Sequence, residues 1–136
     1  MKVNEVKQMK SLALAYMGDA IYEVHVRDYL IRNHYAKVND LHQAAIKYVA
    51  AKAQAKVLRY FLEVKFLDEE EEGVVRRGRN AKAGSIPKNT DIMTYRYSTG
   101  FEALLGFHYY TENNERLNEL MERAVTFVEK GRQTNE

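Results

Sequence analysis

The sequence contains no cysteine and no tryptophan, and Pro87 is its only proline. Without cysteine the chain forms no disulfide and offers no thiolate to a metal ion, which excludes a disulfide-rich secreted protein and a thiolate zinc site. No apolar run approaches the roughly 18 residues of a membrane span, and the first residues do not form the apolar core of a signal peptide. We therefore expect a cytoplasmic protein with no membrane association.

The composition is that of a globular protein, because 46% of the residues are hydrophobic and 29% are charged. A length of 136 residues suits one domain with a real core. We expect residues 1–136 to form that single domain, with no room for an appended binding module.

Apolar residues recur at three- and four-residue spacing, and no stretch alternates as a strand does, so the sequence predicts an all-α fold. Asp40 and Gln43 match a capping box at the start of one helix, and Gly131 marks the end of the last. Gly84, Pro87 and Asn89 indicate an irregular segment. The predicted helices cover residues 3–16 with a continuation to 31, then 41–62, 69–79, about 91–109 and 117–128.

Charge is sorted along the chain, although the formal net charge is only +2. An acidic block at residues 68–72 suits a helix amino terminus, and residues 73–90 carry cations with no acid among them. This segment reads as a basic loop. It can be a solvated surface or a surface that contacts phosphates, and charge alone leaves both interpretations open.

Two acidic residues lie in small, apolar helical settings, Gly18-Asp19-Ala20-Ile21 and Glu102-Ala103-Leu104-Leu105-Gly106. Taken singly, Asp19 reads as a cap or surface residue, and Thr99 to Glu102 reads as a capping box. Taken together, they suggest a carboxylate pair that holds a cation, because an unpaired carboxylate is costly to bury. Glu23 and Asp91 are further acids, which we expect at the surface and at a turn or cap. Aromatic residues such as Tyr16 are expected in core or interface packing.

The chain resembles the catalytic domain of the ribonuclease III family. The resemblance lies in these two motifs and in residues 76–82, Lys88-Asn89 and residues 95–103. The resemblance covers nearly the whole chain and is closest to Mini-ribonuclease III, the short form without a double-stranded RNA-binding domain. It implies that Asp19 and Glu102 are both the catalytic residues and the metal ligands. Ala15 and Thr99 stand where longer members carry two further acids, which matches the reduced acidic set of the short form.

The resemblance further implies an endoribonuclease that uses Mg²⁺, or Mn²⁺ in its place, to cut double-stranded RNA into 5′-phosphate and 3′-hydroxyl ends. The substrate that the resemblance implies is the precursor of large-subunit (23S) ribosomal RNA. The enzyme it implies is a homodimer, with a ribosomal protein as a helper. Two alternatives are a non-catalytic RNA-binding dimer of the same fold and a helical protein-interaction domain. The expected RNA-binding residues are Arg76, Arg77, Arg79, Asn80, Lys82, Lys88 and Arg96.

Overall fold

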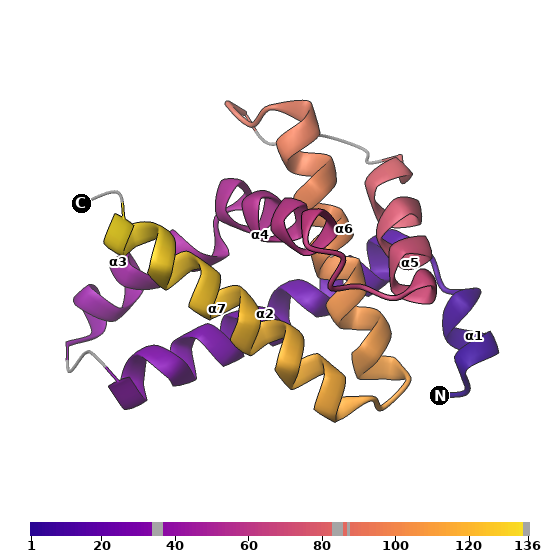
Figure 1. Cartoon of the computed structure of the whole chain (residues 1–136), viewed down its shortest axis with the longest axis horizontal. Coiled ribbons are helices and arrows are strands. Elements are labelled where there is room, and N and C mark those ends of the chain that lie inside the picture. The colour runs from indigo at the N-terminus through magenta and orange to yellow at the C-terminus, as the bar shows by residue number, and fades with distance from the viewer. Residues whose placement is uncertain (34–36, 83–85, 87, 135–136) are drawn as a thin grey trace.

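The computed structural model describes residues 1–33, 37–82, 86 and 88–134, with side chains as far as Gly131. Within these ranges the chain is helical and has no strand, which confirms the all-α prediction (Figure 1). The helices are α1 (Val3–Lys7), α2 (Ser11–Asn33), α3 (Val38–Val49), α4 (Ala51–Glu63), α5 (Glu69–Asn80), α6 (Ile92–Tyr110) and α7 (Asn114–Thr134).

Helix α6 lies at the centre of the molecule, with α2, α4 and α5 packed around it (Figure 1). Aromatic and branched apolar side chains fill the space between these helices, as the edge-to-face contact of Tyr22 with Phe101 at a centroid distance of 5.0 Å illustrates. Because α6 is enclosed on several sides, ten of its nineteen residues are buried. The elements that surround α6 therefore determine what lies beside its one acidic residue, Glu102.

The predicted helix over residues 3–16 is in fact two helices, because α1 ends at Lys7 and α2 begins at Ser11. Val6 of α1 and Leu14 of α2 are both buried in one apolar cluster with Phe107. Both helices turn an apolar face to that cluster, so the spacing of apolar residues runs through the break and conceals it. The predicted continuation to residue 31 is confirmed, with α2 running two residues further, to Asn33.

The predicted helix over residues 41–62 is also divided, at Ala50, whose extended backbone (φ −60°, ψ 148°) separates α3 from α4. Its alanine-rich sequence favours helix throughout, so local preference gives no sign of the break. The capping box of Asp40 with Gln43 is wrong, because α3 begins at Val38 and Asp40 lies inside its first turn. Gly131 does not end the last helix either, since α7 continues to Thr134.

The acidic block does begin a helix, as predicted. Asp68 caps α5 by accepting a hydrogen bond from the Glu71 backbone at 2.8 Å, and the Glu71 carboxylate accepts one from the Asp68 backbone at 2.9 Å. The basic segment that follows is not a loop in its first half, because Arg76 to Asn80 lie within α5. Of the predicted irregular positions, Asn89 has a left-handed backbone with φ 65°, and Gly84 and Pro87 lie outside the described residues.

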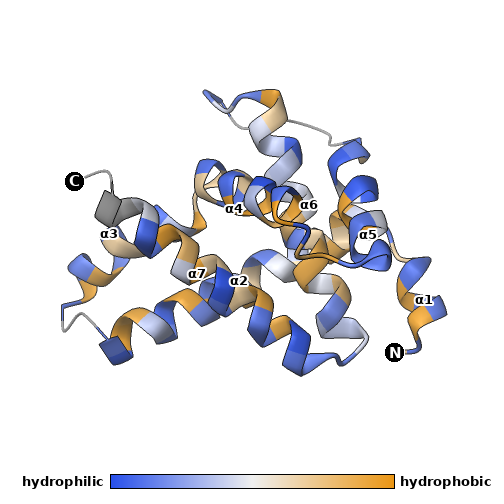
Figure 2. Cartoon of the chain, viewed as in Figure 1, coloured by the Kyte–Doolittle hydropathy of each residue, from blue (hydrophilic) through white to orange (hydrophobic). Residues whose placement is uncertain are grey.

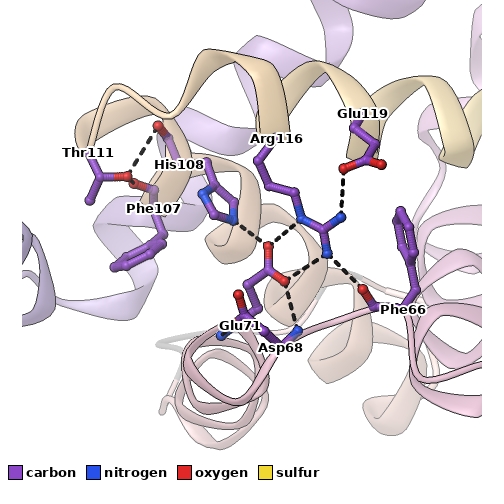
Figure 3. Close-up of polar contacts among 8 residues, drawn as sticks. All are labelled: Phe66, Asp68, Glu71, Phe107, His108, Thr111, Arg116 and Glu119. Atoms are coloured by element: carbon purple, nitrogen blue, oxygen red, sulfur yellow. Dashed lines mark hydrogen bonds and ion pairs between the residues drawn. The ribbon is translucent and has the colours of Figure 1, made fainter.

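Glu71 is the centre of a buried charged cluster that joins α5, α6 and α7 (Figure 3). Arg116 donates to both carboxylate oxygens at 2.8 Å and also to the Phe66 carbonyl at 2.7 Å. His108 lies 2.6 Å from the same carboxylate. Burial by itself would raise the pKa of Glu71, but the hydrogen bonds from Arg116, His108 and the Asp68 backbone lower that pKa to about 2. This glutamate is ionised and fully paired, so it fastens the ends of three helices together.

Candidate functional site

Asp19 and Glu102 are brought together where α2 crosses α6. The two backbones are in direct contact, because a Cβ atom added at Gly18 would lie 1.8 Å from the Glu102 carbonyl oxygen. A second contact lies further along the crossing, where a Cβ added at Gly106 would lie 2.0 Å from the Leu14 carbonyl oxygen. The glycines of both motifs therefore allow the helices to approach closely enough for the neighbouring carboxylates to meet, as the sequence predicted.

The two carboxylates interact directly, and Glu102 is partly buried while Asp19 is exposed. Burial, the charge of Asp19 and a hydrogen bond between the two side chains together raise the pKa of Glu102 to about 9, against a smaller lowering by the Gln54 amide. Neither acid forms an ion pair with any described residue. Glu102 therefore keeps its proton at neutral pH, and a cation at this place would take over the role of that proton.

The oxygen atoms at the crossing are suitable ligands for a hard divalent cation. Asp19 and Glu102 supply carboxylate oxygens, and Gln54 beside them has an amide oxygen, Oε1, that is buried without a hydrogen-bond partner among the described residues. Oxygen ligands completed by water are what Mg²⁺ prefers. No cluster of three or more acids, histidines or cysteines suited to a metal occurs in the described part of the chain, so protein ligands are few.

The other acids that sequence analysis considered have partners of their own. Glu23 forms a surface ion pair with Arg27 at 3.1 Å, and Asp91 caps α6 by accepting a hydrogen bond from the Thr94 backbone at 3.1 Å, as expected. Thr99 lies in the middle of α6 and its hydroxyl donates to the Tyr95 carbonyl, so the capping-box interpretation of Glu102 is wrong. A helix cap therefore does not account for Glu102.

The predicted RNA-binding residues lie along the end of α5, the following segment and the start of α6. Helix α5 meets α6 closely, since a Cβ added at Gly78 would lie 2.9 Å from the Gly100 Cα, two residues before Glu102. Arg79 differs from the others because it is partly buried, lies over the Tyr97 ring and donates to its hydroxyl at 3.0 Å. The exposed ones are Arg76, Arg77, Asn80, Lys82, Lys88 and Arg96.

Sequence analysis missed two features of α4. Arg59 lies over the same Tyr97 ring as Arg79, at 4.5 Å from the ring centroid, and it follows Lys52 and Lys56 at helical spacing on an exposed face. The spacing of these three cations could have been found in the sequence. Gln54 had a weaker signal, a lone amide among alanines, and only the packing of α4 against α6 places it beside Glu102.

No helix in the described ranges is long and apolar enough to cross a membrane.

Comparisons with known proteins agree on one family. The family model of the ribonuclease III domain matches residues 12–113. The chain is 48% identical to a Mini-ribonuclease 3 of Enterococcus faecalis, covering 93% of this chain and 96% of that protein. It is 44% identical to a Mini-ribonuclease 3 of Staphylococcus aureus, covering 92% and 93%. A crystal structure of a Fusobacterium nucleatum protein superposes with a TM-score of 0.79 at 26% identity, covering 93% of this chain and 98% of that one.

Enzymes of this family are endoribonucleases that act on double-stranded RNA with a divalent metal cofactor. The matched residues include both helices that carry the carboxylate pair. The chain belongs to the ribonuclease III family and groups with its Mini-ribonucleases 3.

Proposed function

We propose that this endoribonuclease holds Mg²⁺ at Asp19 and Glu102 and hydrolyses double-stranded RNA there. The observation that supports this site is a carboxylate pair at the α2–α6 crossing that has no cationic partner among the described residues. We further propose that residues 1–136 act as one catalytic domain, because α1 and α7 both pack against α6.

A bound divalent cation supplies Lewis-acid polarisation of a phosphodiester oxygen and a water of lowered pKa. Asp19 and Glu102 would hold that ion, and the glycine contacts keep the two helices that carry them close together. In the free protein Glu102 retains a proton because burial and Asp19 raise its pKa to about 9, so binding of an ion would release this proton. By the family resemblance, the products carry 5′-phosphate and 3′-hydroxyl ends.

The exposed cations near the pair are proposed to bind the RNA backbone. Arg76, Arg77, Lys82 and Lys88 are exposed donors suited to phosphate oxygens. Helical RNA is recognised mainly by shape, phosphates and 2′-hydroxyls. Binding through these residues should therefore depend steeply on salt and weakly on sequence.

We propose that the protein acts as a homodimer through the outer faces of α2 and α3. Large hydrophobic residues are exposed there, with Tyr16 83% and Val38 77% accessible, and Val24, Ile31 and Ile46 lie on the same two helices. Figure 2 shows hydrophobic residues recurring along α2 and α3. Two subunits related by a two-fold axis would present two carboxylate pairs to the two strands of a duplex.

The proposed natural substrate is the precursor of 23S ribosomal RNA in the bacterial cytoplasm, with a ribosomal protein as a helper. This part rests on the resemblance to the Mini-ribonucleases III.

The test uses a labelled RNA duplex with and without Mg²⁺, followed by analysis of the ends of the products. Asp19→Asn should abolish cleavage and retain duplex binding. The control is Asp28→Asn, which replaces an exposed aspartate of the same helix and should leave cleavage unchanged. Ala15 and Thr99, at the places of two family acids, favour a second candidate, a non-catalytic RNA-binding dimer. Duplex binding by the wild type without any Mg²⁺-dependent cleavage would support that candidate and contradict the first.

A further inference from the structure

Gln54 is a buried polar side chain whose hydrogen bonds are incomplete. It lies on α4 with 1% of its surface exposed, and its Nε2 donates to the Val49 carbonyl at 3.1 Å. Its Oε1 has no partner among the described residues. An unsatisfied buried acceptor is unfavourable, so a purely structural purpose would be better served by an apolar residue.

Capping of α3 explains only part of this side chain. Val49 is the last residue of α3, and its carbonyl is one of those that a helix end leaves without an internal partner. The bond from Gln54 satisfies that carbonyl, but it uses one of the two hydrogens on Nε2 and leaves Oε1 unused. An amide that is nine-tenths buried and half-satisfied indicates a further partner.

The packing of α4 against α6 puts this amide beside Glu102. Leu58, one turn after Gln54 on the same face of α4, comes within 3.2 Å of a Cβ added at Gly100. Glu102 is two residues further along α6. The amide forms a side-chain hydrogen bond with the Glu102 carboxylate.

We propose that Gln54 is a positioning residue of the catalytic centre, whose second Nε2 hydrogen bonds to the Glu102 carboxylate and holds it toward Asp19. Its Oε1 then remains to accept a hydrogen bond from a water molecule of the bound ion. This inference rests on the proposed metal site at Asp19 and Glu102. Groups that hydrogen-bond to ligating carboxylates fix their orientation, and their loss typically costs 10- to 100-fold in metal affinity or activity.

The test is Gln54→Met, which keeps the length of the side chain and removes all of its hydrogen bonds. The affinity of the RNA-free protein for Mn²⁺, measured by electron paramagnetic resonance, should fall about 10-fold or more. The rate of duplex cleavage at saturating RNA should fall by a similar factor. Duplex affinity in Ca²⁺ and the melting temperature should stay near those of the wild type, a combination that a merely structural role would not produce.

Gln43→Met is the matched control, because Gln43 is exposed on α3 and its replacement should change none of these measurements. Gln54→Leu is a second apolar variant in case the first does not fold. Wild-type Mn²⁺ affinity in either folded variant would overturn the inference, and so would the failure of both to fold. The proposed function fails separately, when Asp19→Asn leaves Mn²⁺ binding unchanged.

Discussion

Two glutamates, Glu102 in α6 and Glu71 in the adjacent α5, have opposite electrostatic environments. Glu71 is buried against Arg116 and His108, and its pKa is lowered to about 2. Glu102 is partly buried against another carboxylate, Asp19, and its pKa is raised to about 9. Both side chains lose water on folding, which by itself raises the pKa of each. The difference comes from the neighbouring groups.

The comparison separates a structural carboxylate from the one that we propose as a metal ligand. The fold supplies Glu71 with a bidentate arginine, a histidine and a backbone donor, which leaves its oxygens no capacity for a ligand (Figure 3). It supplies Glu102 with a like charge and an amide, which is unfavourable until a cation arrives. A buried acid without a counter-charge is therefore a better guide to a candidate functional site than a buried acid alone.

The largest effect should come from replacing the unpaired acid. Glu102→Gln should reduce duplex cleavage about a thousandfold, because a metal ligand contributes several kcal/mol to transition-state stabilisation. At neutral pH without divalent ions the stability of this variant should stay near that of the wild type, since the amide can donate a hydrogen bond to Asp19 as the protonated Glu102 does. Single-turnover cleavage and urea unfolding measure the two effects. Glu115→Gln, at an exposed glutamate, serves as the control. Cleavage by Glu102→Gln at the wild-type rate would contradict the proposed difference between Glu102 and Glu71.

Removing the partner of the paired acid should act on stability instead. Arg116→Met leaves the buried Glu71 carboxylate with only His108 and the Asp68 backbone N–H as partners among the described residues, and should lower the free energy of unfolding by about 3–5 kcal/mol. Well below the melting temperature, the cleavage rate should stay within a few-fold of the wild type. A stability loss under about 1 kcal/mol would show that the cluster does not fasten the three helices.

The two acids should give stability opposite dependences on pH. The unfolded chain protonates Glu71 near pH 4.5 and the folded chain only near pH 2, so stability should fall by about 3 kcal/mol as pH drops through that range. The unfolded chain ionises Glu102 near pH 4.5 and the folded chain near pH 9, so without divalent ions stability should fall as pH rises between them. Urea unfolding across pH, in chelator, measures both slopes. Glu71→Gln should flatten only the acid side and Glu102→Gln only the alkaline side.

A smaller effect should come from the glycine that brings the carboxylates together. Gly18→Ala places a methyl group against the Glu102 carbonyl and should cost about 1–3 kcal/mol, with slower cleavage as α2 moves away from α6. Gly131→Ala is the matched control within α7, where an added Cβ meets no atom within 4 Å. It should stabilise the protein by about 0.5–1 kcal/mol. Thermal unfolding distinguishes the two, and equal melting temperatures would contradict this account of the crossing.

Local chemistry made some of the fold predictable. Helical spacing gave the all-α class, and the caps at Asp68 and Asp91 marked two helix starts because each side chain bonds to a backbone three residues away. The breaks near Gln8 and at Ala50 were not predictable, since the helices on either side bury their apolar faces in one core and the spacing continues across each break. Gly131 does not mark a helix end either, because α7 continues past it to Thr134.

The candidate site was predictable only where its residues sit in short motifs. Asp19 and Glu102 stood out because glycine and alanine surround them, and the structure brings the two together. Gln54 and Arg59 were missed, since their significance depends on contacts between α4 and α6 across some forty residues of sequence.

The sequence by itself determined that the chain forms helices, where two of their caps lie and which small residues permit close helix crossings, because these properties depend on neighbours within a turn or two. Only the tertiary structure decided which acids acquire a counter-charge. Glu71 belongs to an acidic block that any surface helix could carry, and it becomes structural because Arg116, 45 residues away, folds onto it. Glu102 receives Asp19 instead, since the α2–α6 crossing selects its neighbour.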